Sequence, residues 1–202
     1  FGCWNSKGVD LKLIGLANDY VGKGMNGGKI VITKDKHLKE ERSVLAGNTC
    51  LFGATGGEFY ASGVVGERFA VRNSGAKAII EGSGDHCCEY MTGGEIIVLG
   101  PVGNNFGAGM TGGFAYVFDE DRSFVDKCNK DLVSFNRITS QEMEAHRSYL
   151  KDRIVHFIKE TNSEVGKTIL EDFEKYQSLF WIVTPYAENL TKIIQKTRED
   201  AA

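Results

Sequence analysis

The chain has 202 residues, of which 42% are hydrophobic, so it is long enough to enclose one substantial core or a core with a helical appendage. Its formal net charge of −3 provides no basic field for a phosphate backbone, which argues against a nucleic acid partner. No apolar run approaches the roughly 18 residues that cross a bilayer, and the first residues lack a secretory pattern, so we expect a cytoplasmic protein without a membrane partner.

The distribution of glycine divides the chain into two regions. All but one of the 25 glycines lie at or before Gly113, and the exception is Gly166. Within the first region a Gly-Gly pair, or Gly-Ala at 75–76, recurs at 27–28, 56–57, 75–76, 93–94 and 112–113, at intervals of 29, 19, 18 and 19 residues. A fixed period is the signature of a repeat architecture. We therefore expect a repeat domain over residues 1–130 and a helical extension over residues 131–202.

Aligning the five copies on the first residue of each pair places one chemical type in each column. The residue just before the pair is small and polar, a type that hydrogen-bonds the backbone of a turn. This column holds Asn26, Thr55, Ser74, Thr92 and Thr111. The column nine residues before the pair holds Asn18, Gly47, Gly66, Gly84 and Gly103. Asparagine and glycine best tolerate a positive φ, so we expect a left-handed bend there in each copy.

Apolar residues alternate with other residues after each pair, which predicts a short strand with one buried face. The alternating positions are Ile30 and Ile32, Phe59 and Ala61, Ala78 and Ile80, Ile96 and Val98, and Ala115 and Val117. A repeat of 18 to 19 residues is too short for a pair of helices and too rich in glycine for either one. The pattern therefore favours coils of strand and bend that stack in parallel, about 4.8 Å apart, with like residues over like.

The longer first interval and the end of the chain have patterns of their own. About ten extra residues in the first interval correspond to the charged segment 34–42, which we expect to be a loop. After residue 139, a capping box at 139–142 predicts a helix that ends near Asn162. A second helix is predicted from Val165 through Phe180, ending before Pro185, and a third short helix extends through Ile194.

Two glycine-rich stretches match the dinucleotide fingerprint Gly-x-Gly-x-x-Gly, at residues 22–27 and 107–112. The fingerprint needs a strand before it and a helix after it, but both matches run into predicted strands and lie in register with the repeat. We interpret them as coil geometry rather than nucleotide sites.

The segment Asp85-His86-Cys87-Cys88-Glu89 is the densest group of reactive side chains. It could be a nucleophile pair or a metal site, but Cys87 belongs to an apolar column, and adjacent residues on a strand point to opposite faces. Structural or interface roles are therefore favoured, and the candidate interface residues are Arg68, Arg72, Asp85, His86 and Glu89. The five cysteines have no Cys-x-x-Cys spacing, so we expect reduced packing residues, no metal site and no bound cofactor.

Three stretches carry a resemblance to a known family. They are Ala17 to Gly28, with Asn18-Asp19-Tyr20-Val21-Gly22-Lys23-Gly24; Gly66 to Ala76, with Glu67-Arg68-Phe69-Ala70-Val71-Arg72; and Gly84 to Gly94, with Glu89-Tyr90-Met91-Thr92. The chain resembles the C-terminal glycine-rich domain of the glutamate synthase large-subunit family, continuously over about residues 1–130 and again over 169–185.

The resemblance implies a right-handed parallel β-helix, a single-stranded solenoid, with a C-terminal α-helical extension. In that family the β-helix packs between a glutaminase domain and an FMN and iron–sulfur synthase domain, which are the partners we expect. The open ends of a stacked coil expose unpaired strand edges, so self-association into a homo-oligomer is a further expectation. Position 1 is Phe rather than a cysteine nucleophile, and no FMN barrel or iron–sulfur cysteine cluster is present. The chain is therefore expected to be a non-catalytic scaffold, either a stand-alone subunit or part of a longer chain.

Two other assignments remain open from the sequence. A similar glycine-rich β-helix occurs in formylmethanofuran dehydrogenase complexes, and an autonomous carbohydrate-active β-helix enzyme would place paired carboxylates in a cleft. Glu58, Glu67, Glu89 and Glu95 occupy different columns of the repeat, which argues against such a pair.

Overall fold

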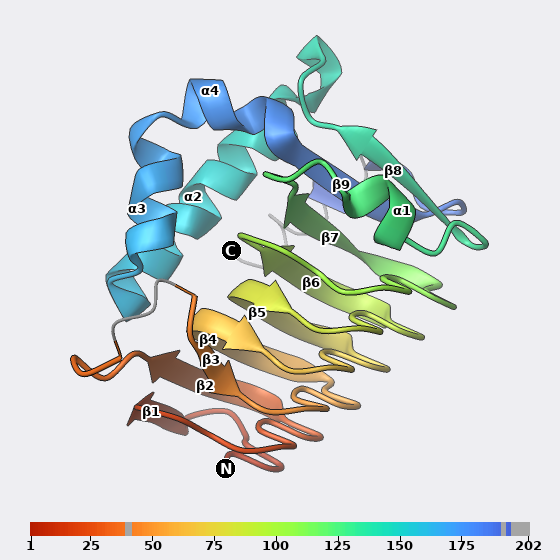
Figure 1. Cartoon of the computed structure of the whole chain (residues 1–202). Helices are drawn as coiled ribbons and strands as arrows, with labels where there is room; N and C mark the ends of the chain where they lie inside the picture. The colour runs from red at the N-terminus through yellow and green to blue at the C-terminus, as the bar shows by residue number, and fades with distance from the viewer. Residues whose placement is uncertain (39–41, 191–192, 195–202) are drawn as a thin grey trace.

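The computed structural model describes residues 1–38, 42–190 and 193–194. Parallel strands stack one above another along the chain, and the helices lie along one side of the stack and over its far end (Figure 1). The strands are β1 Asp10–Ile14, β2 Asn26–Thr33, β3 Val44–Ala46, β4 Gly56–Val65, β5 Ser74–Ser83, β6 Thr92–Val98, β7 Gly112–Phe118, β8 Val133–Arg137 and β9 Phe180–Pro185. The helices are α1 Phe124–Lys127, α2 Glu144–Thr161, α3 Glu164–Glu171 and α4 Phe173–Tyr176, with 3₁₀ turns η1 Gln141–Met143 and η2 Gln177–Leu179.

The strands form one sheet in the order β1-β2-β4-β5-β6-β7-β9-β8, with β3 paired to β4. Pairing is parallel from β1 to β7, and the register places like columns together, as in Ile30 opposite Phe59 and Ala78 opposite Ile96. Thr92 pairs with Gly112, and the N–H of Thr111 donates to the carbonyl of Met91. Residues about nineteen apart therefore lie over one another, and the predicted parallel β-solenoid with a helical extension is confirmed.

Two apolar cores lie on opposite faces of the long strands. The first fills the interior of the coils and includes Ile30, Phe59 and Ile96. The second lies between the outer face of the strands and the helices, where Tyr60 and Tyr116 pack against residues of α2 and β9. Because successive residues of a strand point to opposite faces, one strand supplies both cores.

The bends of the coils are built differently from our expectation. Neither Asn18 nor the four glycines of its column have a positive φ. In this column the glycine is needed for close stacking: a Cβ on Gly103 would lie 2.4 Å from the backbone nitrogen of Asp85. The left-handed residues come later in each turn, at three alternating positions of many residue types, such as Arg68, Ala70 and Arg72 with φ of 58, 57 and 56°.

This alternation directs the backbone N–H groups of a turn toward both neighbouring coils. The N–H groups of Arg68 and Arg72 donate to the carbonyls of Asp85 and Glu89 in the next coil, at 2.8 and 2.9 Å. The N–H of Ala70 between them donates to the carbonyl of Cys50 in the preceding coil, at 2.9 Å. Each turn is therefore hydrogen-bonded on both sides, which offsets the cost of roughly 1–2 kcal/mol for each left-handed residue that is not glycine.

Of the charged segment 34–42, residues 34–38 and 42 lie outside helices and strands between β2 and β3, as predicted, and residues 39–41 lie outside the described residues. β2 and β3 together pair along the single long strand β4, so the loop interrupts one strand of a coil. Its Arg42 reaches along the stack to Glu120, with Nη2 2.9 Å from Oε2.

The C-terminal region contains two strands where we predicted only helices. Residues Phe180–Pro185 form β9, which pairs antiparallel with β7 on one side and with β8 on the other. The predicted second helix is therefore wrong beyond residue 179, because its last apolar residues cover the edge of the sheet and join both cores. Helix α3 also stops at Glu171.

Two smaller predictions for this region have separate outcomes. The capping box is wrong: the turn η1 begins after Ser140, whose side chain makes no cap, and the Arg147 guanidinium donates to the Ser140 carbonyl instead. Of the third helix, helical residues are described at Leu190, Ile193 and Ile194, and the rest lies outside the described residues. The predicted boundary after residue 130 stays a prediction, and the sheet continues past it through β8 and β9.

Candidate functional site

The turn side of the stack brings three of the five candidate interface residues into one cluster. Arg68 Nη1 lies 3.1 Å from Glu89 Oε2, and His86 Nδ1 lies 3.3 Å from Glu89 Oε1. Arg68 stands in the coil before His86 and Glu89, so the cluster joins two adjacent coils. Its arginine is half exposed, and exposed pairs of this kind contribute little to stability. An interface role for this cluster stays a prediction.

The other two candidates have different surroundings. Asp85 Oδ1 accepts a hydrogen bond from the backbone N–H of Asn104 at 2.7 Å, in the same way that Asp19 Oδ1 accepts from Asn48 N–H. Asp85 is thus part of a ladder that joins successive coils. The side chain of Arg72 is exposed, and within the described part of the chain its guanidinium has no ion-pair partner. Arg72 is available to an acidic group of a partner.

The two dinucleotide-like stretches are covered by aromatic rings. A Cβ on Gly24 would lie 2.6 Å from the ring of Trp4, and a Cβ on Gly109 would lie 2.5 Å from the ring of Tyr90. A phosphate cradle needs an open backbone at this place. The rings occupy it, which agrees with the interpretation of these stretches as coil geometry.

Cys87 and Cys88 both face the interior core, and their Sγ atoms are 3.7 Å apart. Our expectation that they point to opposite faces is wrong, because the segment is a turn in which Cys88 has a φ of 60° and not a strand. Burial raises the pKa of the Cys88 thiol well above its usual value. A reactive thiolate needs a lowered pKa, so a packing role fits these residues best.

A buried polar network beneath α2 was not identified from the sequence. Glu95 of β6 is 1% exposed; the hydroxyl of Tyr149 donates to its carboxylate, and Arg153 Nε donates to it at 3.0 Å. The same guanidinium lies 3.6 Å from Glu58, and Nη2 donates to the Tyr60 hydroxyl at 3.3 Å. The carboxylates of Glu58 and Glu95 thus both bind Arg153 and anchor helix α2 to the strands. They do not face each other across a substrate cleft.

The sequence contains a signal for this anchor. Lys29, Glu58, Lys77 and Glu95 form one outward column of alternating charge across adjacent strands. The expectation that Glu58 and Glu95 occupy different columns is therefore wrong, because each stands two residues after the first residue of its pair. A charged column beside apolar columns indicates a face that is covered by polar side chains of another element.

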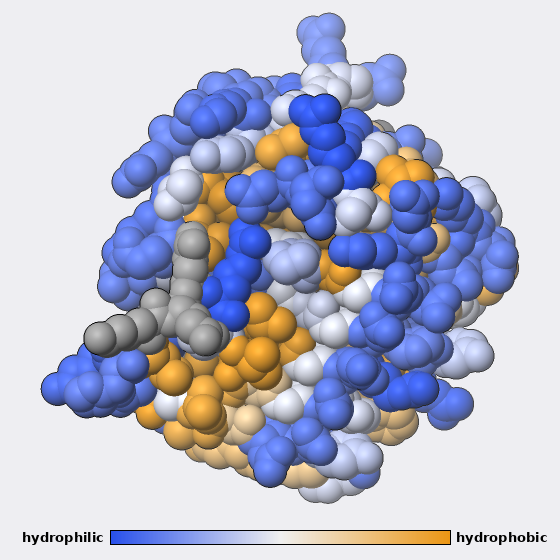
Figure 2. Space-filling model, in the orientation of Figure 1, coloured by the Kyte–Doolittle hydropathy of each residue, from blue (hydrophilic) through white to orange (hydrophobic). Residues whose placement is uncertain are grey.

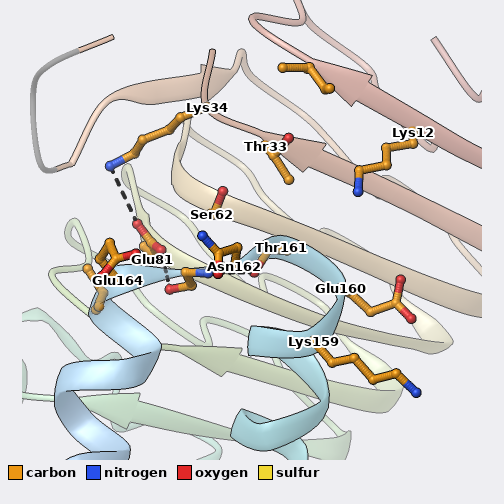
Figure 3. Close-up of a pocket in the computed structure, with 13 residues that line it drawn as sticks. Lys12, Thr33, Lys34, Ser62, Glu81, Lys159, Glu160, Thr161, Asn162 and Glu164 are labelled. Carbon is orange, nitrogen blue, oxygen red and sulfur yellow. Dashed lines mark hydrogen bonds and ion pairs between the residues drawn. The ribbon is translucent and has the colours of Figure 1, made fainter. Parts of the chain in front are cut away.

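A pocket of about 440 Å³ lies where the C-terminal ends of the strands meet the corner between α2 and α3 (Figure 3). Lys12, Thr33 and Ser62 line it from the strands, and Asn162 lines it from the corner. At one side Glu81 accepts a hydrogen bond from Ser163 Oγ at 2.6 Å and lies 4.0 Å from Lys34 Nζ. Sequence columns alone do not predict this pocket, because half of its wall comes from the helical extension.

An exposed apolar patch lies beside the pocket at the N-terminal end of the stack. We call Ile14, Leu16 and Val44 the N-terminal apolar patch; each is about 60% exposed, at 63, 61 and 60%. The segments are adjacent, since the Ala17 N–H donates to the Leu45 carbonyl at 2.8 Å. Figure 2 shows apolar surface over this lower part of the stack. Contiguous exposed apolar groups of this kind mark interaction surfaces.

The described residues contain no group of three or more His, Cys, Asp or Glu side chains that could hold a metal ion. Among the same residues, no helix is long and apolar enough to span a membrane.

Comparison with known proteins gives a consistent result. The family model described as the GXGXG motif matches residues 1–186. A region of ferredoxin-dependent glutamate synthase 1, chloroplastic/mitochondrial, from Arabidopsis thaliana is 51% identical over 193 residues, which are 95% of this chain and 12% of that relative. Ferredoxin-dependent glutamate synthase 2 from Synechocystis sp. is 53% identical over 190 residues, 93% of this chain and 12% of the relative. The chain thus spans only 12% of the length of these relatives.

Proposed function

Because the chain belongs to the GXGXG motif family and corresponds to a region of ferredoxin-dependent glutamate synthases, we propose that it acts as a non-catalytic scaffold domain of such an enzyme. In this role the solenoid holds a glutaminase domain and an FMN-binding synthase domain in a fixed relation. The assembled enzyme forms L-glutamate from glutamine and 2-oxoglutarate as an oxidoreductase, and the cofactors belong to the partner domains.

One observation carries the proposal: the potentially reactive side chains of the described residues serve to join coils and helices to one another. Glu95 and Arg153 anchor α2, Asp85 joins two coils, and Cys87 and Cys88 pack in the core. A stack that is hydrogen-bonded in every turn and anchored to its helices is rigid, which suits an element that fixes the distance between two sites. Activity then depends on the other domains.

Two surfaces are proposed to contact the partner domains. The first is the turn-side cluster of Arg68, His86 and Glu89 together with Arg72. The second is the N-terminal apolar patch. Arginine and exposed apolar groups are enriched where protein surfaces meet.

The experiment uses the full-length synthase that contains this chain. Arg68→Glu and Arg72→Glu together should leave glutamine hydrolysis intact, and also glutamate formation from supplied ammonia. Glutamate formation from glutamine should fall severalfold, because the two sites are no longer held together. Lys151→Glu and Lys159→Glu, on the exposed side of α2, provide a control with the same change of charge. Equal effects of both pairs would refute the interface, and turnover by the isolated chain would refute the scaffold role.

The comparisons favour glutamate synthase over an assembly like formylmethanofuran dehydrogenase, since the matched relatives carry the former name. The convergence of Glu58 and Glu95 on Arg153 gives no support to carbohydrate cleavage. A cytoplasmic location stays a prediction, as several relatives are named chloroplastic.

A further inference from the structure

We propose that the pocket between the strand ends and the α2–α3 corner binds a small carboxylate. Nothing in the scaffold role requires such a site, and the proposal stands independently of that role. It follows from the polar groups that line the pocket and from which of them already have partners in the protein.

The carboxylates of the pocket wall are engaged within the chain. Glu160 Oε1 lies 3.0 Å from Lys29 Nζ, and Glu164 Oε1 lies 2.7 Å from Lys167 Nζ. Glu81 accepts from Ser163 Oγ and lies near Lys34, as described above. Each of these three carboxylates therefore has a cation or a hydroxyl of this chain beside it.

The donors of the pocket are not matched in the same way. Ser62 is 5% exposed and Thr33 is 9% exposed, yet in the described part of the chain neither hydroxyl has a hydrogen-bond partner in the protein. Neither hydroxyl oxygen is closed off from solvent; both open onto the pocket, so both are free to donate to a group bound there. Lys12 adds an ammonium group that extends from β1 toward the same space, and it too has no ion-pair partner among the described residues (Figure 3).

An excess of donors selects a ligand that brings acceptors and negative charge. A carboxylate supplies both, and its two oxygens can accept from an ammonium group and a hydroxyl together. The side chain of Ile14 gives one apolar wall for a short carbon chain. A volume of about 440 Å³ is within the range of small-molecule sites. The carboxylate can come from a free metabolite or from an acidic side chain of a neighbouring domain.

The test is a titration of the isotope-labelled 202-residue chain with glutarate, followed by amide chemical shifts. Glutaramide, which has the same shape without the charges, is the matched probe. Saturable shifts of Thr33, Ser62 and Asn162 are expected with glutarate, with a dissociation constant of about 1 mM or below, and no shifts with glutaramide. The absence of saturable shifts with glutarate, or equal responses to both compounds, would overturn the proposal.

Variants identify the groups that bind. Ser62→Ala removes a hydroxyl that bonds nothing in the protein, so the thermal midpoint should not fall, while the affinity for glutarate falls about tenfold. Lys12→Gln should weaken binding at least as much. Lys159→Gln is the control, because this lysine lines the same pocket but its ammonium group points away from it (Figure 3). Equal losses from Lys12→Gln and Lys159→Gln would show a general effect of charge and refute the site.

The two sources of the carboxylate are separated in the full-length synthase. If the ligand is free, glutarate protects a Ser62→Cys thiol from alkylation in the full-length enzyme as it does in the isolated chain. If a neighbouring acidic side chain occupies the pocket, that thiol is protected without glutarate. Rapid alkylation of Ser62→Cys that glutarate does not slow, in both forms, would contradict either source.

Discussion

Gly103→Ala tests whether glycine is required at the coil corners for close stacking. An ideal Cβ at this position lies 2.4 Å from the nitrogen of Asp85 and 2.6 Å from the carbonyl carbon of Gly84, and both neighbours are backbone atoms. The two coils must separate locally, which costs roughly 1–3 kcal/mol for crowding. Separation also weakens the hydrogen bond from Asn104 N–H to Asp85 Oδ1, now 2.7 Å, worth about 1 kcal/mol. The expected loss in the free energy of unfolding is ~3 kcal/mol.

Equilibrium unfolding in urea measures this loss. With a slope of about 2 kcal/mol per molar, the midpoint should fall by ~1.5 M. Gly53→Ala is the matched control, because Gly53 has a φ of +63° and nothing within 4 Å of an added Cβ. It should lose only about 1 kcal/mol, the penalty of a left-handed alanine. If Gly53→Ala costs as much as Gly103→Ala, the glycines serve backbone freedom and the stacking argument is refuted.

Four further outcomes are expected. Arg153→Met leaves the buried carboxylate of Glu95 without its cation and should cost about 3–5 kcal/mol in urea unfolding; adding Glu95→Met should recover part of it, and no recovery would contradict the anchor. Arg72→Gly relieves a φ of 56° and should change stability by less than about 1 kcal/mol, because the steric relief is offset by the larger conformational entropy that glycine loses on folding; a larger loss would show that the side chain matters to the fold. Burial raises the pKa of the Cys50 thiol from 9.0 to about 11, so between these pH values the unfolded thiol releases its proton while the folded one keeps it, and stability should fall as pH rises through this window. Unfolding midpoints measured from pH 8 to 11 should fall less steeply in Cys50→Ala. Cys3 is the exposed cysteine, so it should be the one thiol that an alkylating reagent modifies rapidly in the native protein.

The repeat could be predicted because stacking imposes the same chemical demand at the same place in every coil. The pairs Ile30 with Phe59 and Ala78 with Ile96 were visible as one column before their register was known. The reason for the corner glycines could not be predicted. A glycine in a sequence can be required because a Cβ would clash or because the backbone has a positive φ, and the sequence does not tell these two reasons apart. Positive φ occurs instead at residues such as Arg68 and Ala70, where hydrogen bonds to neighbouring coils determine the backbone and residue preference does not.

The errors near the C-terminus share one physical cause. Phe180 has helical spacing with Phe173 and Tyr176, but tertiary contact of its segment with β7 and β8 decides its conformation. For the same reason the pocket could not be predicted, because Ser62 and Asn162 are brought together only by the position of α2 over the strands. Of the candidate interface residues, the contact between Arg68 and Glu89 depends on coil register, which the repeat does predict.

The strict period of the coils has a consequence for how far apart two attached bodies can stand. Each repeat advances the stack by about 4.8 Å, so inserting or deleting one whole repeat lengthens or shortens it by that step. The antiparallel strands β9 and β8 cover the far end of the stack, where β9 pairs with β7. The length of the stack can change only by whole repeats. A partial repeat would shift the register and turn the inward side chains outward. The number of repeats therefore sets the distance between the bodies attached at the two ends.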